Sequence, residues 1–389
     1  MKENKINLDF EKFRQNNNLP KIGEKIVVAM SGGVDSSVAA ILLKKAGYDV
    51  IGVTMQLHQN KSNNKTKTCC SGIDISDARN VSKKYKFKHY IIDYQKEFKE
   101  SVINEFVNSY LNGETPIPCI RCNQTVKFTD LIRFTKSVGS KYLATGHYVR
   151  RKNNGKDTLM FQAVDYLKDQ SYFLFATTHS QLKLLRFPLG EFKKEQVREF
   201  AKYFKLKNAK KPDSQDICFI PDGNYGKFIK NTLPGCLKKG DFVDINGKII
   251  GKHKGIIHYT VGQRKGIGIG GIKGSSEHKP LYVIKIDSYR NKITVGPKKY
   301  LMQYKIYLKD INLISTKFNN NFEALIKIRS GPKKINGLVK ILKKQNQGVV
   351  ELSNPESGVA PGQACVFYDK DKMIGGGWIT AAEKEVLTL

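Results

Sequence analysis

Short apolar runs alternate with helical segments through the first half of the chain. Apolar, partly β-branched runs stand at 26–30, 50–54, 89–92 and 142–144, and a helical pattern covers 74–85. Runs of this length are typical of strands buried on both faces of a parallel sheet. Their alternation with helical segments predicts an α/β fold built on a doubly wound parallel sheet.

The pattern changes beyond about residue 222. Glycine becomes frequent, and short runs at 248–251, 281–286, 292–295, 322–328 and 348–352 lie between turn signals. In the run at 322–328, every second residue is apolar, as in a half-buried strand. The second half is therefore predicted to be mostly β-structure.

This change of pattern sets the predicted domain boundaries. We expect an α/β domain at 1–220, a small, mostly β central domain at 221–296, and a C-terminal β-barrel at 297–389. Within the first domain, residues 1 to about 20 are polar and are expected to form a loosely held extension.

A serine- and glycine-rich loop, Ser-Gly-Gly-Val-Asp-Ser at 31–36, joins the first predicted strand to a helix. At such a join, unpaired backbone N–H groups and the helix dipole attract phosphate. Gly32 and Gly33 allow a tight turn, and Ser31 donates a hydroxyl hydrogen bond. Asp35 would face phosphate only across a divalent cation, so the residues of this loop fit magnesium pyrophosphate as ligand.

The alternative interpretation of this loop is a glycine turn followed by a serine or aspartate cap. The loop also lacks the Gly-Lys-Ser/Thr ending of a Walker loop, so cleavage at the γ-phosphate is not implied.

Composition and charge narrow the class of protein. The 389 residues are 40% hydrophobic and 26% charged, which is typical of a soluble globular protein of two or three domains. No apolar run approaches the ~18 residues of a membrane span, and no signal peptide is recognisable, so we expect a cytoplasmic protein with no membrane partner. A formal net charge of +32 favours RNA or DNA as partner, although a solvated lysine-rich surface is the alternative.

Three of the seven cysteines stand in sequence contexts that suggest chemistry. Cys119 and Cys122 have CxxC spacing in a segment, 115–123, that we expect to be a proline-stiffened loop. Arg121, and also Lys127, would lower a thiol pKa there, whereas the aspartates near Cys218 would raise its pKa. A single CxxC is weak evidence for zinc. The three cysteines suit redox chemistry, persulfide transfer or an iron–sulfur cluster with an open iron.

The remaining cysteines are assigned structural places. Cys236 and Cys365 are interpreted as small buried hydrophobic residues, and Cys69 and Cys70 as residues of a surface loop. A GxGxxG pattern at 266–271 has no strand-to-helix setting, so we interpret it as a flexible β-turn.

Several motifs, in this order, carry a resemblance that runs nearly from end to end. They are AMSGGVDSSV, TPIPCIRCN, VKF, ATGHYVR, KDQSYFLF, DSQDICFIPDG, HYTVGQRKGIGIGG and GVAPGQACVFYD. The loop at 31–36 resembles the PP-loop of the ATP pyrophosphatase superfamily, and the whole set is similar to the tRNA-specific 2-thiouridylase (MnmA) family.

The resemblance implies an enzyme that replaces the 2-oxygen of the wobble uridine of tRNA with sulfur. ATP, with Mg²⁺, would convert the uridine 2-carbonyl to an adenylate and release pyrophosphate. Sulfur would then come from a cysteine persulfide to give 2-thiouridine.

The resemblance also implies roles for individual residues. Cys122 would be the nucleophile that attacks the activated base or opens the persulfide. Cys218 would carry the persulfide sulfur received from a relay donor protein, and a disulfide between these two cysteines would need reduction after each turnover. The residues implied to bind ATP are Ala29, Met30, Ser31, Gly32, Gly33, Val34, Asp35, Ser36, Met55 and Gly146. Those implied to contact tRNA are His147, Lys168, Asp169, Gln170 and Gln363.

The sequence departs from the family at Cys119, where many members have an aspartate suggested to transfer a proton. Either another group handles that proton, or Cys119, Cys122 and Cys218 together ligate a [4Fe-4S] cluster. The basic-aromatic pattern expected near 327–332 is also weak, which leaves the tRNA contacts of the barrel open. The alternatives to a uridine thiolase are a cluster-dependent PP-loop enzyme acting on another base, and a basic RNA-binding module with a degenerate nucleotide loop.

Overall fold

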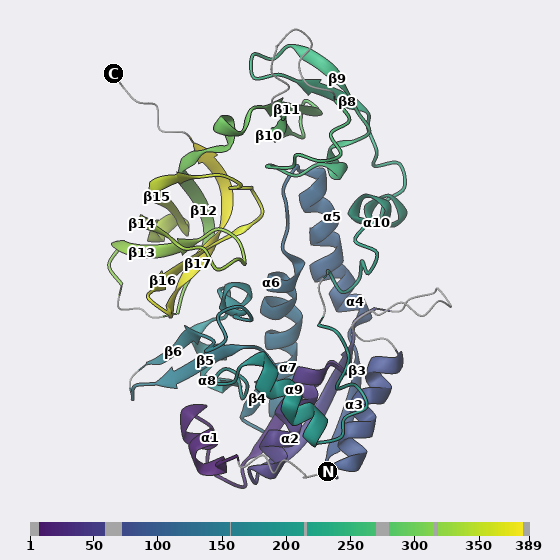
Figure 1. Cartoon of the computed structure of the whole chain (residues 1–389), viewed down its shortest axis with the longest axis vertical. Coiled ribbons are helices and arrows are strands. Elements are labelled where there is room, and N and C mark those ends of the chain that lie inside the picture. Colours follow the sequence, from purple (N-terminus) through teal and green to yellow (C-terminus); the bar gives the residue numbers. More distant parts are fainter. Residues whose placement is uncertain are drawn as a thin grey trace.

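The computed structural model describes residues 8–58, 72–155, 157–213, 216–269, 280–314 and 318–383. A parallel sheet with its helices lies at one end of the long axis, a small sheet lies at the other end, and a barrel stands alongside (Figure 1). Cys69 and Cys70, Ser214 and Gln215, and the last two glycines of the GxGxxG pattern lie outside the described residues.

The parallel sheet confirms the predicted fold class. Its strand order is β3-β2-β1-β4-β7, and every pairing between neighbours is parallel. Because β1 lies between β2 and β4, the chain moves outward in both directions from β1, and ligands bind at such a point, beyond the carboxyl ends of the strands. The strands are β1 (Lys25–Ala29), β2 (Asp49–Gln56), β3 (Lys88–Asp93), β4 (Tyr142–Thr145) and β7 (Leu185–Arg186).

Alternate residues of β1 point into different cores, as the period of a strand requires. Ile26 and Val28 belong to the core shared with α2 (Val34–Lys45) and α9 (Lys194–Tyr203). Val27 belongs to the larger core on the opposite face, and all three residues are fully buried. The remaining helices of this part include α3 (Gly72–Lys84), α4 (Gln95–Phe98), η1 (Lys99–Ile103), α5 (Asn104–Leu111), α7 (Leu131–Ser137) and α8 (His179–Leu184).

Two predictions for this part were wrong. The described part of the N-terminal segment is not a loose extension, because helix α1 (Phe10–Asn16), capped by Asp9, buries Phe13 against Phe192 at a ring distance of 6.0 Å. The CxxC segment is not a loop: Pro118 occupies the first turn of α6 (Pro118–Cys122), where its fixed φ suits a helix and its missing N–H costs nothing. This helix continues into η2 (Asn123–Asp130), a π-helical stretch.

The central part is a four-stranded sheet preceded by helix α10 (Tyr225–Thr232). Its strand order is β10-β11-β8-β9. The strands are β8 (Gly240–Val243), β9 (Ile249–His253), β10 (Tyr282–Asp287) and β11 (Lys292–Gly296).

The C-terminal part is an antiparallel barrel, closed by pairing between its first and last strands, β12 and β17. Every second residue of β13 packs inward, as the alternating pattern predicted. The barrel strands are β12 (Gln303–Leu313), β13 (Asn321–Lys327), β14 (Ile335–Leu342), β15 (Gln347–Glu356), β16 (Ala364–Asp369) and β17 (Lys372–Glu383).

A hairpin from the first part extends the barrel sheet. Strands β5 (Val149–Asn153) and β6 (Thr158–Gln162) pair with each other, and β6 pairs with β17. The junction is also fixed by the Tyr172 hydroxyl, which donates to the Ala364 carbonyl at 3.0 Å, and by Phe175, which packs edge-to-face on Trp378. The barrel is therefore joined to the first part across the boundary predicted at residue 297.

Within the described residues, no helix is both long and apolar enough to cross a membrane.

Candidate functional site

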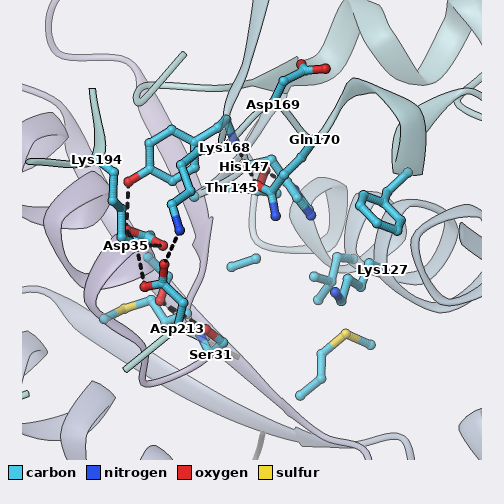
Figure 2. Close-up of a pocket in the computed structure, with 18 of the residues that line it drawn as sticks. Ser31, Asp35, Lys127, Thr145, His147, Lys168, Asp169, Gln170, Lys194 and Asp213 are labelled. Carbon is cyan, nitrogen blue, oxygen red and sulfur yellow. Dashed lines mark hydrogen bonds and ion pairs between the residues drawn. The ribbon is translucent and has the colours of Figure 1, made fainter. Parts of the chain in front are cut away.

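A cavity of about 500 Å³ opens at the carboxyl ends of β1, β2 and β4 (Figure 2). Residues implied to bind ATP line it from all three strands and from the loop after β1: Ala29, Met30, Ser31, Asp35, Ser36, Met55 and Gly146. Gly32, Gly33 and Val34 complete the same loop without lining the cavity. Polar and apolar surface meet here, as a nucleotide with its phosphates requires.

The loop after β1 is held tightly by backbone contacts. Gly32 has φ +72°, and a Cβ there would lie 2.2 Å from the carbonyl oxygen of Asp74. Gly33 is the N-cap of α2 and supplies no side-chain cap, so the N–H groups of the first turn remain available to a ligand. A Cβ on Gly146 would lie 2.9 Å from the Ser36 nitrogen, so only glycine lets the end of β4 approach the loop this closely.

The carboxylate of Asp35 is in direct contact with a lysine in the cavity wall. Lys194 Nζ lies 2.8 Å from Asp35 Oδ1 and 2.7 Å from Oδ2, and the Tyr148 hydroxyl donates to Oδ1 at 2.8 Å. Burial and the negative charge of Asp35 raise the pKa of Tyr148, so its phenol stays protonated. Carboxylate oxygens suit magnesium, but Lys194 contacts the same two oxygens.

Sequence reasoning missed Lys194 and Tyr148. Tyr148 stands inside the ATGHYVR motif, which singled out only its histidine. Lys194 follows another lysine at the start of an amphipathic helix, and no local pattern distinguishes it from its exposed neighbour Lys193.

His147 also lines the cavity, as a neutral ring. Its Nδ1 is 2.8 Å from the Thr145 hydroxyl, and Phe128 and Phe187 pack against it edge-to-face. Burial, with a smaller effect from the positive charge of Lys127, lowers the pKa of His147 to about 3. At neutral pH the ring therefore offers hydrogen bonds rather than charge.

The other residues implied to contact tRNA have distinct settings. Lys168 is exposed and its Nζ pairs with Asp213 at 2.8 Å, while Gln170 accepts from the Tyr148 backbone nitrogen at 2.9 Å. Gln363, on the barrel side, donates to the Thr115 carbonyl at 2.7 Å, just ahead of α6.

Asp169 differs from its neighbours because its side chain is buried. Its oxygens accept from the Ser171 hydroxyl and from Gln162, both at 2.8 Å, and Lys327 of the barrel lies 3.7 Å away. Figure 2 shows its carboxylate turned away from Asp35 and Lys194. A tRNA contact at this position would therefore use the backbone.

The cysteines implied to transfer sulfur lie on two segments. On α6, Cys122 is buried and Cys119 is exposed, whereas Cys218 is half-buried. Next to Cys218, Phe219 packs edge-to-face on Phe98 and Phe106 of the helices that precede α6. This aromatic packing fixes the segment of Cys218 against the same core that contains Cys122.

Arg121, expected to act on a thiol, is engaged elsewhere. Its Nε donates to Glu105 at 2.8 Å, and its guanidinium stacks over Trp378 of the barrel at 4.5 Å from the ring centre. Its role is therefore to dock α6 against the barrel and α5.

The three cysteines considered as ligands of an iron–sulfur cluster lie on helix α6 and on the segment of Phe219. Over the described ranges, no three residues of the Cys, His, Asp and Glu types are grouped closely enough to hold a metal ion. Cys119 and Cys122 differ in exposure although they share one turn of helix.

Comparisons with known proteins cover nearly the whole chain. Family models match at 24–222 ("tRNA methyl transferase HUP domain"), at 226–297 ("tRNA methyl transferase PRC-barrel domain") and at 303–379 ("Aminomethyltransferase beta-barrel domain").

Curated relatives share a different name from these models. Proteins named tRNA-specific 2-thiouridylase MnmA are 49% identical over 365 residues in Ehrlichia ruminantium (strain Welgevonden) and 48% identical over 366 residues in Rickettsia canadensis (strain McKiel). The alignments cover 93% and 92% of this chain, and 96% and 97% of those proteins.

Among solved structures, an NMN synthetase from Francisella tularensis aligns with a TM-score of 0.36 at 19% identity, covering 59% of this chain and 87% of that one. A 4-thiouridine synthetase in complex with RNA and ATP aligns with a TM-score of 0.34 at 16% identity, covering 55% and 51%.

Proposed function

Because the chain belongs to the tRNA-specific 2-thiouridylase (MnmA) family, we propose that the cavity beyond β1 is where it activates a uridine of tRNA with ATP for exchange of oxygen by sulfur. The chain is a tRNA sulfurtransferase that uses ATP. The observation that carries the assignment to this cavity is the convergence of the 31–36 loop, Met55 and Gly146 around one space.

We propose that the loop N–H groups and Ser31 hold the phosphates of ATP, while Met55 and the strand ends enclose the rest of the nucleotide. Asp35 would hold Mg²⁺, which neutralises phosphate charge when bound and is usually held in proteins by one or two carboxylates plus phosphate oxygens.

The reaction begins with an exchange at phosphorus. The uridine 2-carbonyl oxygen forms a bond to the α-phosphorus, and the bond to pyrophosphate breaks. The former carbonyl oxygen then leaves as part of AMP when sulfur bonds to C2, so adenylation turns oxide into a good leaving group.

We propose that the sulfur comes from a persulfide on Cys218, supplied by a relay donor protein. In one order of events, the outer sulfur bonds to C2 and Cys122 then attacks the inner sulfur. In the other order, Cys122 attacks the persulfide first and releases sulfide to C2. Both orders leave a disulfide between Cys122 and Cys218, and a thiol reductant must supply two electrons before the next turnover.

Cys122 lies in the large hydrophobic core and Cys218 packs against the same core, and this shared packing supports a persulfide route that uses both cysteines. His147, Lys168, Gln170 and Gln363 border the cavity or α6, and we propose that they contact the tRNA.

Nucleoside mass spectrometry tests this proposal. Unmodified tRNA is incubated without oxygen with iron-free protein, magnesium ATP and a persulfide donor. We expect 2-thiouridine to appear together with pyrophosphate. Formation only after cluster reconstitution would contradict the persulfide route, and no 2-thiouridine under either condition would contradict the assigned reaction.

A further inference from the structure

The 31–36 loop is held from one side by an asparagine far away in the sequence. The Asn208 amide nitrogen donates to the Gly32 carbonyl at 2.9 Å and lies 3.4 Å from the Ser37 hydroxyl. Asn208 stands 176 positions after Gly32 and is not part of the cavity lining. The contact therefore reaches the loop from outside the cavity.

The orientation of the Asn208 side chain is defined by its surroundings. The residue is 7% exposed, and because a carbonyl oxygen only accepts, the amide nitrogen must face Gly32. The amide oxygen of Asn208 is also buried and has no hydrogen-bond donor among the residues that the structure describes. A buried acceptor without a donor costs free energy of folding, so this amide adds little to stability.

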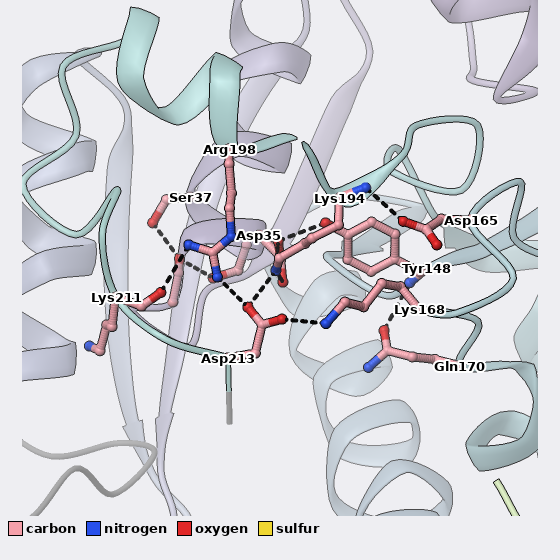
Figure 3. A network of polar contacts seen from close by, with 12 residues as sticks. Asp35, Ser37, Tyr148, Asp165, Lys168, Gln170, Lys194, Arg198, Lys211 and Asp213 are labelled. Carbon is pink, nitrogen blue, oxygen red and sulfur yellow. Dashed lines mark hydrogen bonds and ion pairs between the residues drawn. The ribbon is translucent and has the colours of Figure 1, made fainter. Parts of the chain in front are cut away.

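The segment of Asn208 is anchored on two helices. Lys211 forms an ion pair with Asp74 of α3. Arg198 of α9 donates to the Ala209 carbonyl at 3.4 Å and to the Lys211 carbonyl at 3.3 Å (Figure 3). Asn208 therefore contacts the loop from a fixed support.

The Gly32 carbonyl determines how the next peptide unit is turned. The peptide between Gly32 and Gly33 is trans, so its N–H points away from its carbonyl. Holding the carbonyl at Asn208 turns the Gly33 N–H to the opposite side. Gly32 has φ +72°, and glycine backbone adopts many conformations, so a contact from outside the loop is needed to keep one of them.

We propose that Asn208 is a positioning residue for the 31–36 loop. Its amide holds the Gly32 carbonyl and thereby keeps the loop N–H groups in the orientation that binds the phosphates of ATP. This inference rests on the proposed function, because it takes this loop to be the phosphate site. Asn208 acts through the loop and contributes to nucleotide affinity rather than to stability.

The first test is the affinity of the full chain, with Mg²⁺, for an ATP analogue that has a methylene bridge between the α- and β-phosphorus and cannot release pyrophosphate. For Asn208→Ala, the dissociation constant rises about tenfold, as expected for the loss of one buried hydrogen bond. Asn208→Asp places an oxygen against the Gly32 carbonyl and loses at least as much affinity. Because Asp and Asn have nearly the same shape, Asn208→Asp also decides the question should Asn208→Ala fail to fold.

Asn17 provides a matched control. It is 6% exposed, and its amide nitrogen donates to the Phe13 carbonyl at 3.0 Å, at the end of α1. Asn17→Ala removes the same kind of hydrogen bond from a different part of the fold. It lowers the urea midpoint at least as much as Asn208→Ala and leaves the affinity for the analogue within about twofold of the wild type.

Steady-state pyrophosphate release in the presence of tRNA gives a second readout. In Asn208→Ala, KM for ATP rises about tenfold while KM for tRNA stays within about twofold of the wild type, because the contact acts on the loop alone. A merely structural role would reduce the fraction of active protein and leave both KM values unchanged.

The outcomes separate the two proposals. If the wild-type chain does not bind the analogue, the proposed function fails and the inference fails with it. If the wild type binds the analogue and both Asn208 variants bind it equally well, the inference alone is overturned. Equal losses of affinity in Asn208→Ala and Asn17→Ala also overturn it, since the effect would then follow from stability and not from the loop.

Discussion

Adjacent residues in the turn at 165–170 have different physical settings. Lys168 is exposed and reaches across to Asp213, while the next side chain, Asp169, is buried against Ser171 and Lys327. The KDQSYFLF motif contains both residues. Only the exposed side chain of Lys168 can contact a polyanion.

At the residue scale, the proposed sulfur-carrying role of Cys218 gives a direct prediction. Cys218→Ser keeps the nucleotide cavity intact and lacks the thiol, so pyrophosphate release on adding tRNA continues while 2-thiouridine is not formed. Both products are measured in the same reaction. Cys236→Ser, also half-buried, serves as the matched control and retains thiolation. Full thiolation by Cys218→Ser would remove this cysteine from the mechanism.

A second residue-scale prediction concerns acid stability. Burial lowers the pKa of His147 to about 3 and that of His89 to about 4, whereas both would titrate near 6.5 in the unfolded chain. Below pH 6.5 the unfolded state binds protons that the folded state does not. The free energy of unfolding therefore falls as the pH drops from 6.5 towards 4, by up to about 1.4 kcal/mol per pH unit for each histidine.

Urea unfolding at pH 7.5, 6.5 and 5.5 checks this prediction. His147→Gln should show a shallower decline between pH 6.5 and 5.5 than the wild type. An identical pH dependence in the variant would show that the folded-state pKa of His147 is not depressed.

At the element scale, helix α6 carries both the proposed nucleophile, Cys122, and a residue that docks the helix, Arg121. Cys122 and Arg121 are neighbours on it, and Arg121 reaches both Glu105 of α5 and Trp378 of β17. The π-helical stretch that follows widens the helix directly after Cys122, a feature frequent at functional sites.

Arg121→Met should therefore disturb both stability and turnover. Loss of the charged hydrogen bond and the cation–π contact lowers the free energy of unfolding by about 1–2 kcal/mol. Thiolation falls further than ATP binding, since α6 carries Cys122. Arg133→Met, whose side chain is 77% exposed, should have little effect on either measurement. A double-mutant cycle with Trp378→Leu measures the coupling, and zero coupling would contradict the docking role.

The sequence predicted elements where one local pattern dominates. The strands β1 to β4 and the alternation in β13 were readable because β-branched and apolar residues recur at a strand period. Helix α6 was missed because two prolines in 115–123 indicate a loop when counted locally, although one of them begins the helix. Lys194 was missed because its partners lie at distant positions in the chain, so only the folded molecule brings them together.

At the scale of the whole molecule, one hydrophobic core runs through all three parts. It contains Phe175 of the first part, Phe242 of the central sheet and Trp378 of the barrel. Beside it, Lys327 of β13 and Asp169 form an ion pair whose side chains are 2% and 1% exposed. Burial lowers the pKa of Lys327, and the charge of Asp169 opposes that shift.

Lys327→Met leaves the Asp169 carboxylate buried without its cation and should lower the free energy of unfolding by about 3 kcal/mol. Trp378, the single tryptophan, is 5% exposed at this junction, so its fluorescence reports the loss in a urea titration. Lys340→Met, which removes an exposed pair with Glu351, should change stability by less than about 0.5 kcal/mol. Equal effects of the two substitutions would contradict a special cost of the buried pair.

The hairpin of β5 and β6 also limits how the chain can be divided. Because β6 hydrogen-bonds to β17, a fragment ending near residue 297 keeps the hairpin but loses the strand that covers its outer edge. An uncovered strand edge is a template for pairing with another copy of the same fragment. Such a fragment would tend to self-associate, so the catalytic part is best studied with its barrel attached.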